Sequence, residues 1–244
     1  MTTIASRLQA VKARISVAAT AAGRAPGEIT LVAVSKTFPP QAVAEAYAAG
    51  QSAFGENYAQ EGIDKIVALS RLPLERHVAS PEGPRLRPLE WHYIGPIQSN
   101  KTRPIAENFD WVHGIDRTKI AERLSASRPD NMPALQVCIQ VNVSGEASKS
   151  GVAPDSVFDL ALTIKRLPHL RLRGLMAIPE PTPDAALRHS YFRMLREIQH
   201  DLLHRGVALD TLSMGMSDDL EAAIAEGATL VRVGRAIFGE RGAG

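Results

Sequence analysis

Hydrophobic and polar positions follow two patterns along the chain, one typical of amphipathic helices and one of buried strands. In the first part of the chain, apolar side chains recur every three or four residues among polar neighbours, which predicts a helix over 2–22. The residues that carry this pattern are Ile4, Leu8, Val11 and Ile15. After it, short apolar runs rich in β-branched residues alternate with further helical segments, so we expect strands joined by helices.

Eight strands and seven further helices can be placed in this way. We expect strands over 29–35, 51–54, 90–94, 111–113, 135–143, 170–175, 209–212 and 229–233. We expect helices over 40–49, 57–69, 99–107, 117–127, 154–166, 184–205 and 217–226. The helical spacing is clearest between Leu187 and Leu202, within the longest of these helices.

Strands that alternate with helices are compatible with an open doubly wound sheet and with a (β/α)8 barrel. The number of strands and the length of 244 residues favour the barrel. No GxGxxG motif follows the first strand, which argues against a dinucleotide-binding open sheet. We therefore predict an α/β protein whose residues 1–244 form a single (β/α)8 TIM barrel domain.

One segment, 70–90, interrupts the alternation. It contains four prolines and no periodic apolar positions. We expect a surface loop insertion and not a separate domain. Its arginines could hold a ligand, but a solvated loop is the simpler expectation.

Composition and charge exclude several classes of protein. The 28 Lys and Arg residues nearly balance the 26 Asp and Glu residues, so a net charge of +2 offers no strong attraction for nucleic acid or an anionic membrane. The single Cys138 excludes an intrachain disulfide and a multi-cysteine zinc site, and its mid-strand position predicts a buried, inert thiol. The histidines lack metal-ligand spacing. Without a secretory pattern or a membrane-spanning apolar run, we expect a cytoplasmic protein with no metal.

Because barrel enzymes place their active sites at the carboxyl ends of the strands, we searched those positions for reactive side chains. Lys36 directly follows the first strand, so its amine would point into the barrel mouth. Partial desolvation there can lower the pKa of a lysine and free its amine for Schiff-base formation. The alternative is an ordinary strand-end lysine that extends its amine to water.

The last two strands end in residues that suit an anion. Arg232 lies inside an apolar strand, and its burial would require an anionic or hydrogen-bond-accepting partner. Gly234 follows, and a glycine turn into a helix offers N–H groups to a phosphate, although an ordinary turn is the alternative. Ser213, after the seventh strand, is available to bind an anion. Ser217 is expected to cap the next helix.

These residues suggest a phosphorylated carbonyl compound as ligand, since an amine, an arginine and a phosphate cradle would share one barrel mouth. Two classes of protein fit this chemistry: a Schiff-base aldolase acting on a sugar phosphate, or a protein that holds pyridoxal 5′-phosphate (PLP). His92, in the third strand, is either a packed histidine or a residue of the same site.

Seven segments, in order and over nearly the whole chain, resemble the family of pyridoxal phosphate homeostasis proteins. They are LVAVSKTFP (31–39), FGENYAQE (54–61), WHYIGPIQSNK (91–101), QVNVSGEASKSGV (140–152), LRGLMAIP (172–179), LSMGMSDDLEAAIAEGATLVRVG (212–234) and AIFGER (236–241). Seven matching blocks are far more specific than a single short motif.

The resemblance implies the alanine-racemase-type PLP barrel, known as PLP fold type III, and it assigns roles to residues. Lys36 would hold PLP as a Schiff base. Arg232 would face the pyridine nitrogen, where a guanidinium leaves that nitrogen largely unprotonated and the cofactor a poorer electron sink. Asn57 would form part of the pocket wall. Three further residues match positions around the phosphate: Ser213, Gly234 and Arg235, the last two mainly through their backbone N–H groups.

The resemblance also implies a function in intracellular PLP (vitamin B6) homeostasis without evident catalysis. Related racemases use a second acid/base on the opposite face of the cofactor, supplied with the help of an additional β domain, and we expect no such domain here. The family binds, buffers and delivers PLP. We therefore expect a monomer whose partners are PLP and, transiently, apo forms of PLP-dependent enzymes. A racemase-like enzyme of low activity is the alternative, and a PLP-sensing interaction module is less favoured than either.

Three features lie outside this transfer of roles. Phe38 stands where some members have a lysine, so a PLP-transfer route through that position is not expected here. Lys149 is retained and is either a secondary PLP contact or a solvent-exposed lysine. The segment 70–90 has no functional interpretation from the sequence.

Overall fold

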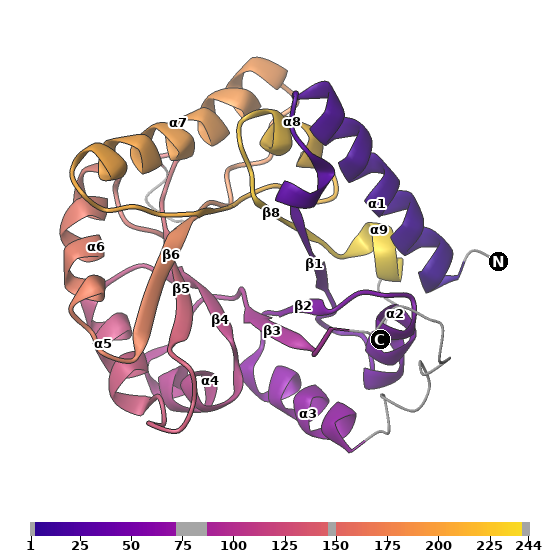
Figure 1. The fold of residues 1–244 in the computed structure, drawn as a ribbon, viewed down its shortest axis with the longest axis horizontal. Helices are drawn as coiled ribbons and strands as arrows, with labels where there is room; N and C mark the ends of the chain where they lie inside the picture. The colour runs from indigo at the N-terminus through magenta and orange to yellow at the C-terminus, as the bar shows by residue number, and fades with distance from the viewer. Residues whose placement is uncertain (1–2, 72–86, 146–149, 241–244) are drawn as a thin grey trace.

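The computed structural model describes residues 3–71, 87–145 and 150–240, and it folds them into a closed barrel of parallel strands (Figure 1). Every strand pairs with the next one in sequence, and β8 pairs with β1 to close the sheet. The strands are β1 (Thr30–Val34), β2 (Ala53–Glu56), β3 (Glu90–Tyr93), β4 (Trp111–Ile115), β5 (Leu135–Gln140), β6 (Leu170–Met176), β7 (Thr211–Ser213) and β8 (Leu230–Val233). All eight predicted strands and the predicted (β/α)8 barrel are confirmed.

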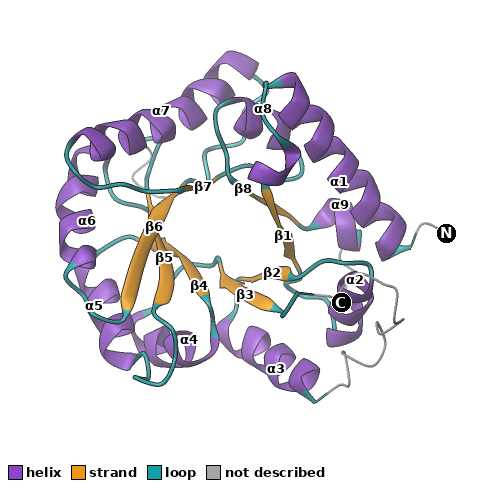
Figure 2. Cartoon of the chain, viewed as in Figure 1, coloured by secondary structure: helices purple, strands orange, loops and turns teal. Residues whose placement is uncertain are grey.

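A ring of helices surrounds the strands, as Figure 2 shows. Each strand is followed by a helix, so the carboxyl ends of all strands meet at one end of the barrel. The helices are α1 (Ile4–Ala21), α2 (Pro40–Ala48), α3 (Ala59–Ser70), α4 (Thr102–Asn108), α5 (Thr118–Ser127), α6 (Val157–Lys165), α7 (Ala185–His204), α8 (Leu220–Ala225) and α9 (Arg235–Phe238). Helices α1 to α8 overlap the predicted helices, with ends that differ by only a few residues, and α9 is the short helix that follows Gly234.

The N-terminal helix α1 completes this ring. Its N-terminus is capped by Thr3, whose side chain accepts a hydrogen bond from the backbone N–H of Ser6. Within the described residues β8 is followed only by the short α9, and α1 contacts α8, α9 and α2 where a longer eighth helix would lie (Figure 1). Helix α1 therefore covers the seam at which β8 closes on β1.

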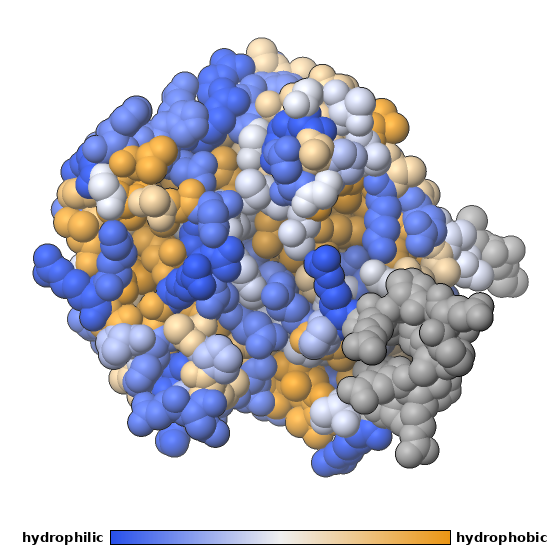
Figure 3. Space-filling model, in the orientation of Figure 1, coloured by the Kyte–Doolittle hydropathy of each residue, from blue (hydrophilic) through white to orange (hydrophobic). Residues whose placement is uncertain are grey.

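Apolar side chains fill the layer between the strands and the helices, whereas the barrel interior is partly polar. The outer layer contains the largest fully buried side chains, among them Phe54, Phe109 and Phe192. Inside the barrel, one small apolar cluster consists of Val32, Ala53 and Leu230. Towards the carboxyl ends of the strands it is followed by the buried polar side chains of His92, His113, Ser213 and Arg232. On the face shown in Figure 3, hydrophilic residues cover much of the surface.

Cys138 lies in this interior beside Trp111 and Met176. It is fully buried, and burial raises the pKa of its thiol to about 12, so the thiol stays protonated at neutral pH. The prediction of a buried cysteine is confirmed, and the raised pKa fits the expected lack of reactivity.

Two segments from the sequence analysis reach beyond the described residues. In the predicted insertion 70–90, Ser70 ends α3, and residues 72–86 lie outside the described part of the chain, as does Lys149. None of the helices that the structure describes is long and apolar enough to cross a membrane.

Candidate functional site

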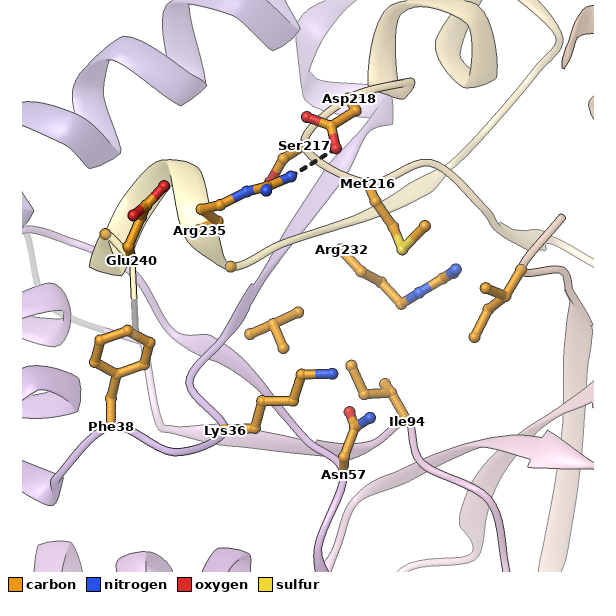
Figure 4. A pocket seen from close by; sticks show the side chains of 14 residues that line it. Lys36, Phe38, Asn57, Ile94, Met216, Ser217, Asp218, Arg232, Arg235 and Glu240 are labelled. Atoms are coloured by element: carbon orange, nitrogen blue, oxygen red, sulfur yellow. Dashed lines mark hydrogen bonds and ion pairs between the residues drawn. The ribbon is translucent and has the colours of Figure 1, made fainter. Parts of the chain in front are cut away.

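A cavity of about 580 Å³ opens at the carboxyl ends of the strands, a volume typical of small-molecule sites (Figure 4). Its walls come from the segments that end or follow β1, β2, β3, β6, β7 and β8. The lining residues are Val34, Lys36, Phe38, Asn57, Ile94, Ile178, Met216, Ser217, Asp218, Arg232, Gly234, Arg235, Gly239 and Glu240. The strand ends searched in the sequence analysis therefore lie around this cavity.

The cavity brings together five of the six residues expected to bind a cofactor: Lys36, Asn57, Arg232, Gly234 and Arg235. In Figure 4 the Lys36 side chain enters from the segment after β1, and the Arg232 side chain enters from β8. Ser213 does not line the cavity. Its side chain is fully buried next to Arg232, and the phosphate contact implied for it stays a prediction.

Arg232 is a buried cation with two protein acceptors. One terminal nitrogen donates to Ser213 Oγ at 2.6 Å, and the other donates to the carbonyl oxygen of Ala177 at 2.9 Å. Burial lowers the pKa of the guanidinium to about 10, so Arg232 remains charged at neutral pH. These contacts supply the partners that the sequence analysis required for a buried arginine, and they fix the guanidinium at the cavity wall.

From Ser213 a chain of hydrogen bonds continues through the barrel interior. Ser213 Oγ lies 2.7 Å from His113 Nδ1, His113 Nε2 lies 2.9 Å from His92 Nδ1, and His92 Nε2 lies 2.8 Å from Glu90 Oε1. With both imidazoles neutral, every donor in the chain points away from Arg232 and towards the Glu90 carboxylate. His92 is therefore a packed histidine of the barrel interior, and it also stacks on Trp111.

His113, in the middle of this series of hydrogen bonds, is fully buried. Burial lowers its pKa well below the usual value, and the nearby His92 and Arg232 lower it further. The Glu90 carboxylate has a lowered pKa because it accepts the hydrogen bond from His92. The sequence analysis did not single out His113, and no local motif marks it.

Behind Lys36 lies a second buried polar cluster, which the sequence analysis also missed. Lys65 Nζ, on α3, donates to the backbone carbonyl oxygen of Ser35 at 2.7 Å, to Glu56 Oε1 at 2.8 Å and to Glu61 Oε1 at 2.6 Å. The Ser35 hydroxyl donates to the same Glu56 oxygen at 2.6 Å. Desolvation raises the pKa of Glu56, and the Lys65 ammonium opposes that rise.

The loop after β7 contributes the opposite wall and corrects one expectation. Helix α8 begins at Leu220 with Asp219 as its N-cap residue, so Ser217 does not cap it and lines the cavity instead. The Asp219 carboxylate accepts the backbone N–H of Met216, which folds the loop before the helix starts. Asp218 pairs with Arg235 at 2.6 Å at the exposed rim (Figure 4).

One buried polar atom in the cavity wall has no hydrogen-bond partner within the described part of the chain. It is Oδ1 of Asn57, which follows β2. A buried amide oxygen without a donor is unfavourable, so this atom is suited to a ligand that donates a hydrogen bond. No group of three or more His, Cys, Asp or Glu side chains in residues 3–71, 87–145 and 150–240 could hold a metal ion.

Comparison with known proteins identifies the family. The family of the alanine racemase, N-terminal domain, matches residues 6–242. This chain belongs to that family. Within it, the chain belongs with the pyridoxal phosphate homeostasis proteins. It is 59% identical over 241 residues to the one of Pseudomonas aeruginosa, covering 99% of this chain and 97% of that protein. It is 51% identical to the one of Escherichia coli strain K12, covering 99% and 98%.

Solved structures agree with this family membership. PipY of Synechococcus elongatus, solved without PLP, is 36% identical, with a TM-score of 0.82 over 97% of this chain and 100% of that one. Its structure with PLP bound has a TM-score of 0.79 at 35% identity and the same coverage. Alanine racemase from Corynebacterium glutamicum shares the barrel fold at 17% identity, with a TM-score of 0.62 over 94% of this chain and 60% of that one.

Proposed function

We propose that this protein binds PLP, attaches it covalently through Lys36 and buffers or delivers it for PLP-dependent enzymes. The observation that carries the proposal is that the Lys36 amine and the Arg232 guanidinium extend into one cavity from neighbouring strands. The names of the homologous homeostasis proteins and the PLP-bound PipY structure support the same ligand.

The residues of the cavity fit the functional groups of PLP. Lys36 offers an amine for the aldehyde, Arg232 offers N–H donors for the pyridine nitrogen, and the unpartnered Asn57 oxygen offers an acceptor. Gly234 and Arg235 line the wall where β8 ends, on the side suited to the phosphate. When bound, PLP supplies an electrophilic carbonyl carbon and a conjugated ring that can accept electrons.

Each of these side chains has a separate task in holding the ligand. Arg232 stays a cation and cannot accept a proton, so it keeps the ring nitrogen opposite it from gaining a stable positive charge. Arg235 is exposed and paired with Asp218, and it can exchange this carboxylate for a phosphate at the rim. Gly234 lets the backbone after β8 pass close to β1, because a Cβ at this position would lie 3.1 Å from the carbonyl oxygen of Val34.

The same set of residues supports binding without catalysis. Racemisation requires a second acid/base on the face of the ring opposite the lysine. The described residues that line the cavity include no tyrosine, histidine or cysteine, and of its two carboxylates, Asp218 is ion-paired with Arg235. If the protein is a carrier, an added amino acid should not exchange its Cα hydrogen for deuterium in heavy water. Exchange would favour the racemase-like alternative.

The first prediction concerns covalent attachment. PLP mixed with the wild-type protein should give a visible absorbance band that borohydride abolishes, and mass spectrometry should then find one label, on Lys36. Lys36→Ala should lose the label, because the described cavity wall contains no other lysine. The exposed Lys101→Ala should label like the wild type. A Lys36→Ala protein with an undiminished label would contradict the proposal.

Delivery is tested separately. In the presence of a scavenger that captures free PLP, the PLP-loaded protein should activate an apo PLP-dependent enzyme faster than the same amount of free PLP does. The proposal includes a monomer in the cytoplasm, which sedimentation and cell fractionation would test.

A further inference from the structure

The residue after Lys36 has an unusual backbone conformation. Thr37 has φ of +69°, and it is the only non-glycine residue with a positive φ in the part of the chain that the structure describes. A β-branched residue in the left-handed region is sterically unfavourable, so other contacts must hold it there. The conformation determines how the chain turns from β1 towards α2, and therefore where the Lys36 side chain starts.

The contact that holds Thr37 comes from α3. Glu61 Oε1 accepts the backbone N–H of Thr37, and the same oxygen accepts a hydrogen bond from Lys65 Nζ. Lys65 in turn donates to the carbonyl oxygen of Ser35. The residues on both sides of Lys36 are thus attached to one ion pair on one helix.

The lysine of this ion pair is fixed by burial. The Lys65 side chain is 3% exposed and Glu56, its second carboxylate partner, is fully buried, whereas Glu61 is 29% exposed. A buried ammonium needs all of its hydrogen bonds satisfied, and Lys65 uses its three donors on Ser35, Glu56 and Glu61. The cluster therefore has little freedom to move and can serve as a rigid support for the loop.

We propose that Glu61 and Lys65 are positioning residues that aim the Lys36 amine at the carbonyl carbon of the ligand. The inference rests on the proposed function. In the step concerned, the neutral Lys36 amine forms a carbon–nitrogen double bond with the aldehyde carbon, and its two hydrogens leave with the aldehyde oxygen as water. The cluster touches none of the reacting atoms and acts only through the backbone of residues 35 and 37.

The test separates covalent attachment from simple binding. Glu61→Ala should slow borohydride-trapped labelling of Lys36 by PLP by about 10- to 100-fold, the scale expected for a misplaced reacting group. Its affinity for pyridoxine 5′-phosphate, an alcohol that cannot bond to the lysine, should stay within about twofold of wild type, since such affinity depends on the cavity alone. Lys65→Met should act in the same direction as Glu61→Ala.

Two further variants make the result specific. Asp64→Ala, at an exposed position on the same helix, should label at the wild-type rate. Thr37→Gly should restore much of the lost rate when combined with Glu61→Ala, because glycine adopts a positive φ without steric cost. In the protein without ligand, amide hydrogen exchange at Thr37 should be faster in Glu61→Ala than in wild type.

Four results would overturn the inference. Glu61→Ala could label as fast as wild type, it could lose pyridoxine 5′-phosphate binding and PLP labelling to the same extent, or Thr37→Gly could fail to restore the rate. In each of these cases wild-type labelling would remain and the proposed function would stand. If wild-type Lys36 were not labelled at all, the proposed function itself would fail, and the positioning role with it.

Discussion

At the scale of single residues, two hydrogen-bonded imidazoles separate the buried Arg232 guanidinium from the partly exposed Glu90 carboxylate. Arg232 is charged at the cavity wall, and the Glu90 carboxylate lies at the far end of the hydrogen-bonded chain. Burial lowers the pKa of His113, and protonation there would also place a second cation close to Arg232. Keeping His113 neutral in the folded protein therefore lowers the free energy of unfolding by an amount that grows as the pH falls.

We predict that His113 makes the protein less stable in mild acid. Below pH 6.5 the unfolded chain binds a proton at this histidine and the folded protein does not, so the free energy of unfolding falls as the pH falls. Between pH 7.5 and 5.5 the loss is at most about 1.4 kcal/mol, the value reached if the folded protein binds no proton at His113 in this range. In urea titrations at the two pH values, His113→Gln should lose that part of the difference, and the exposed His200→Gln should keep it. Identical pH dependence in His113→Gln and wild type would refute the prediction.

At the scale of elements, β6 and β7 pack together at Gly174, which has the least room for a side chain among the glycines that the structure describes. A Cβ at Gly174 would lie 1.8 Å from the carbonyl oxygen of Thr211, its partner across the two strands. No L-side chain fits there unless the strands separate. We predict that Gly174→Ala destabilises the protein by more than about 2 kcal/mol, as expected for overpacking against rigid backbone.

The matched control for this prediction is Gly27→Ala. A Cβ at Gly27 has no heavy atom within 4 Å, so this variant should stay within about 0.5 kcal/mol of wild type. Urea unfolding of both variants measures the difference. A Gly174→Ala protein as stable as Gly27→Ala would mean that β6 and β7 are not packed as described.

Which elements form could be predicted from the sequence, but their ends depend on tertiary contacts. The predicted strand 135–143 ends at Gln140, because beyond it only Val141 forms an isolated bridge, with Val152. The predicted helix 217–226 starts three residues late, at Leu220, because the Asp219 carboxylate accepts the backbone N–H of Met216 and holds the preceding residues in a turn. Neither contact leaves a signal in the hydrophobic pattern.

The part of the candidate site that lies at strand ends could be predicted from the sequence, but the contacts between distant elements could not. Strand ends project into the barrel mouth in any (β/α)8 fold, so Lys36 and Arg232 could be found by position. Lys65 could not, because a lysine on an amphipathic helix is usually exposed, and its burial depends on Glu56 from another element. The hydrogen bond between His113 and Ser213 joins residues that are 100 positions apart in the sequence, and it forms only in the closed barrel.

At the scale of the whole molecule, the site depends on the closure of the barrel. Lys36 follows β1 and Arg232 lies on β8, so the cavity exists only when the first and last strands pair. Helix α1 covers that seam, and it contacts α2, α8 and α9. Helix α1 thus stabilises a site that is assembled from the first and last strands of the barrel.

The last prediction tests this dependence through Leu8, a fully buried side chain of α1. Leu8→Ala should lower the free energy of unfolding by about 2–5 kcal/mol, the usual cost of such a truncation. Val17→Ala, on the same helix but 71% exposed, should change it by less than about 0.5 kcal/mol. Because α1 and the seam form one packed unit, circular dichroism and tryptophan fluorescence should report a single coincident transition in both variants. Excess PLP should raise the unfolding midpoint of both variants, since it binds only when the seam is closed. If Leu8→Ala unfolded in two steps, with PLP binding retained after the first, α1 would be an independent cover and the barrel would close without it.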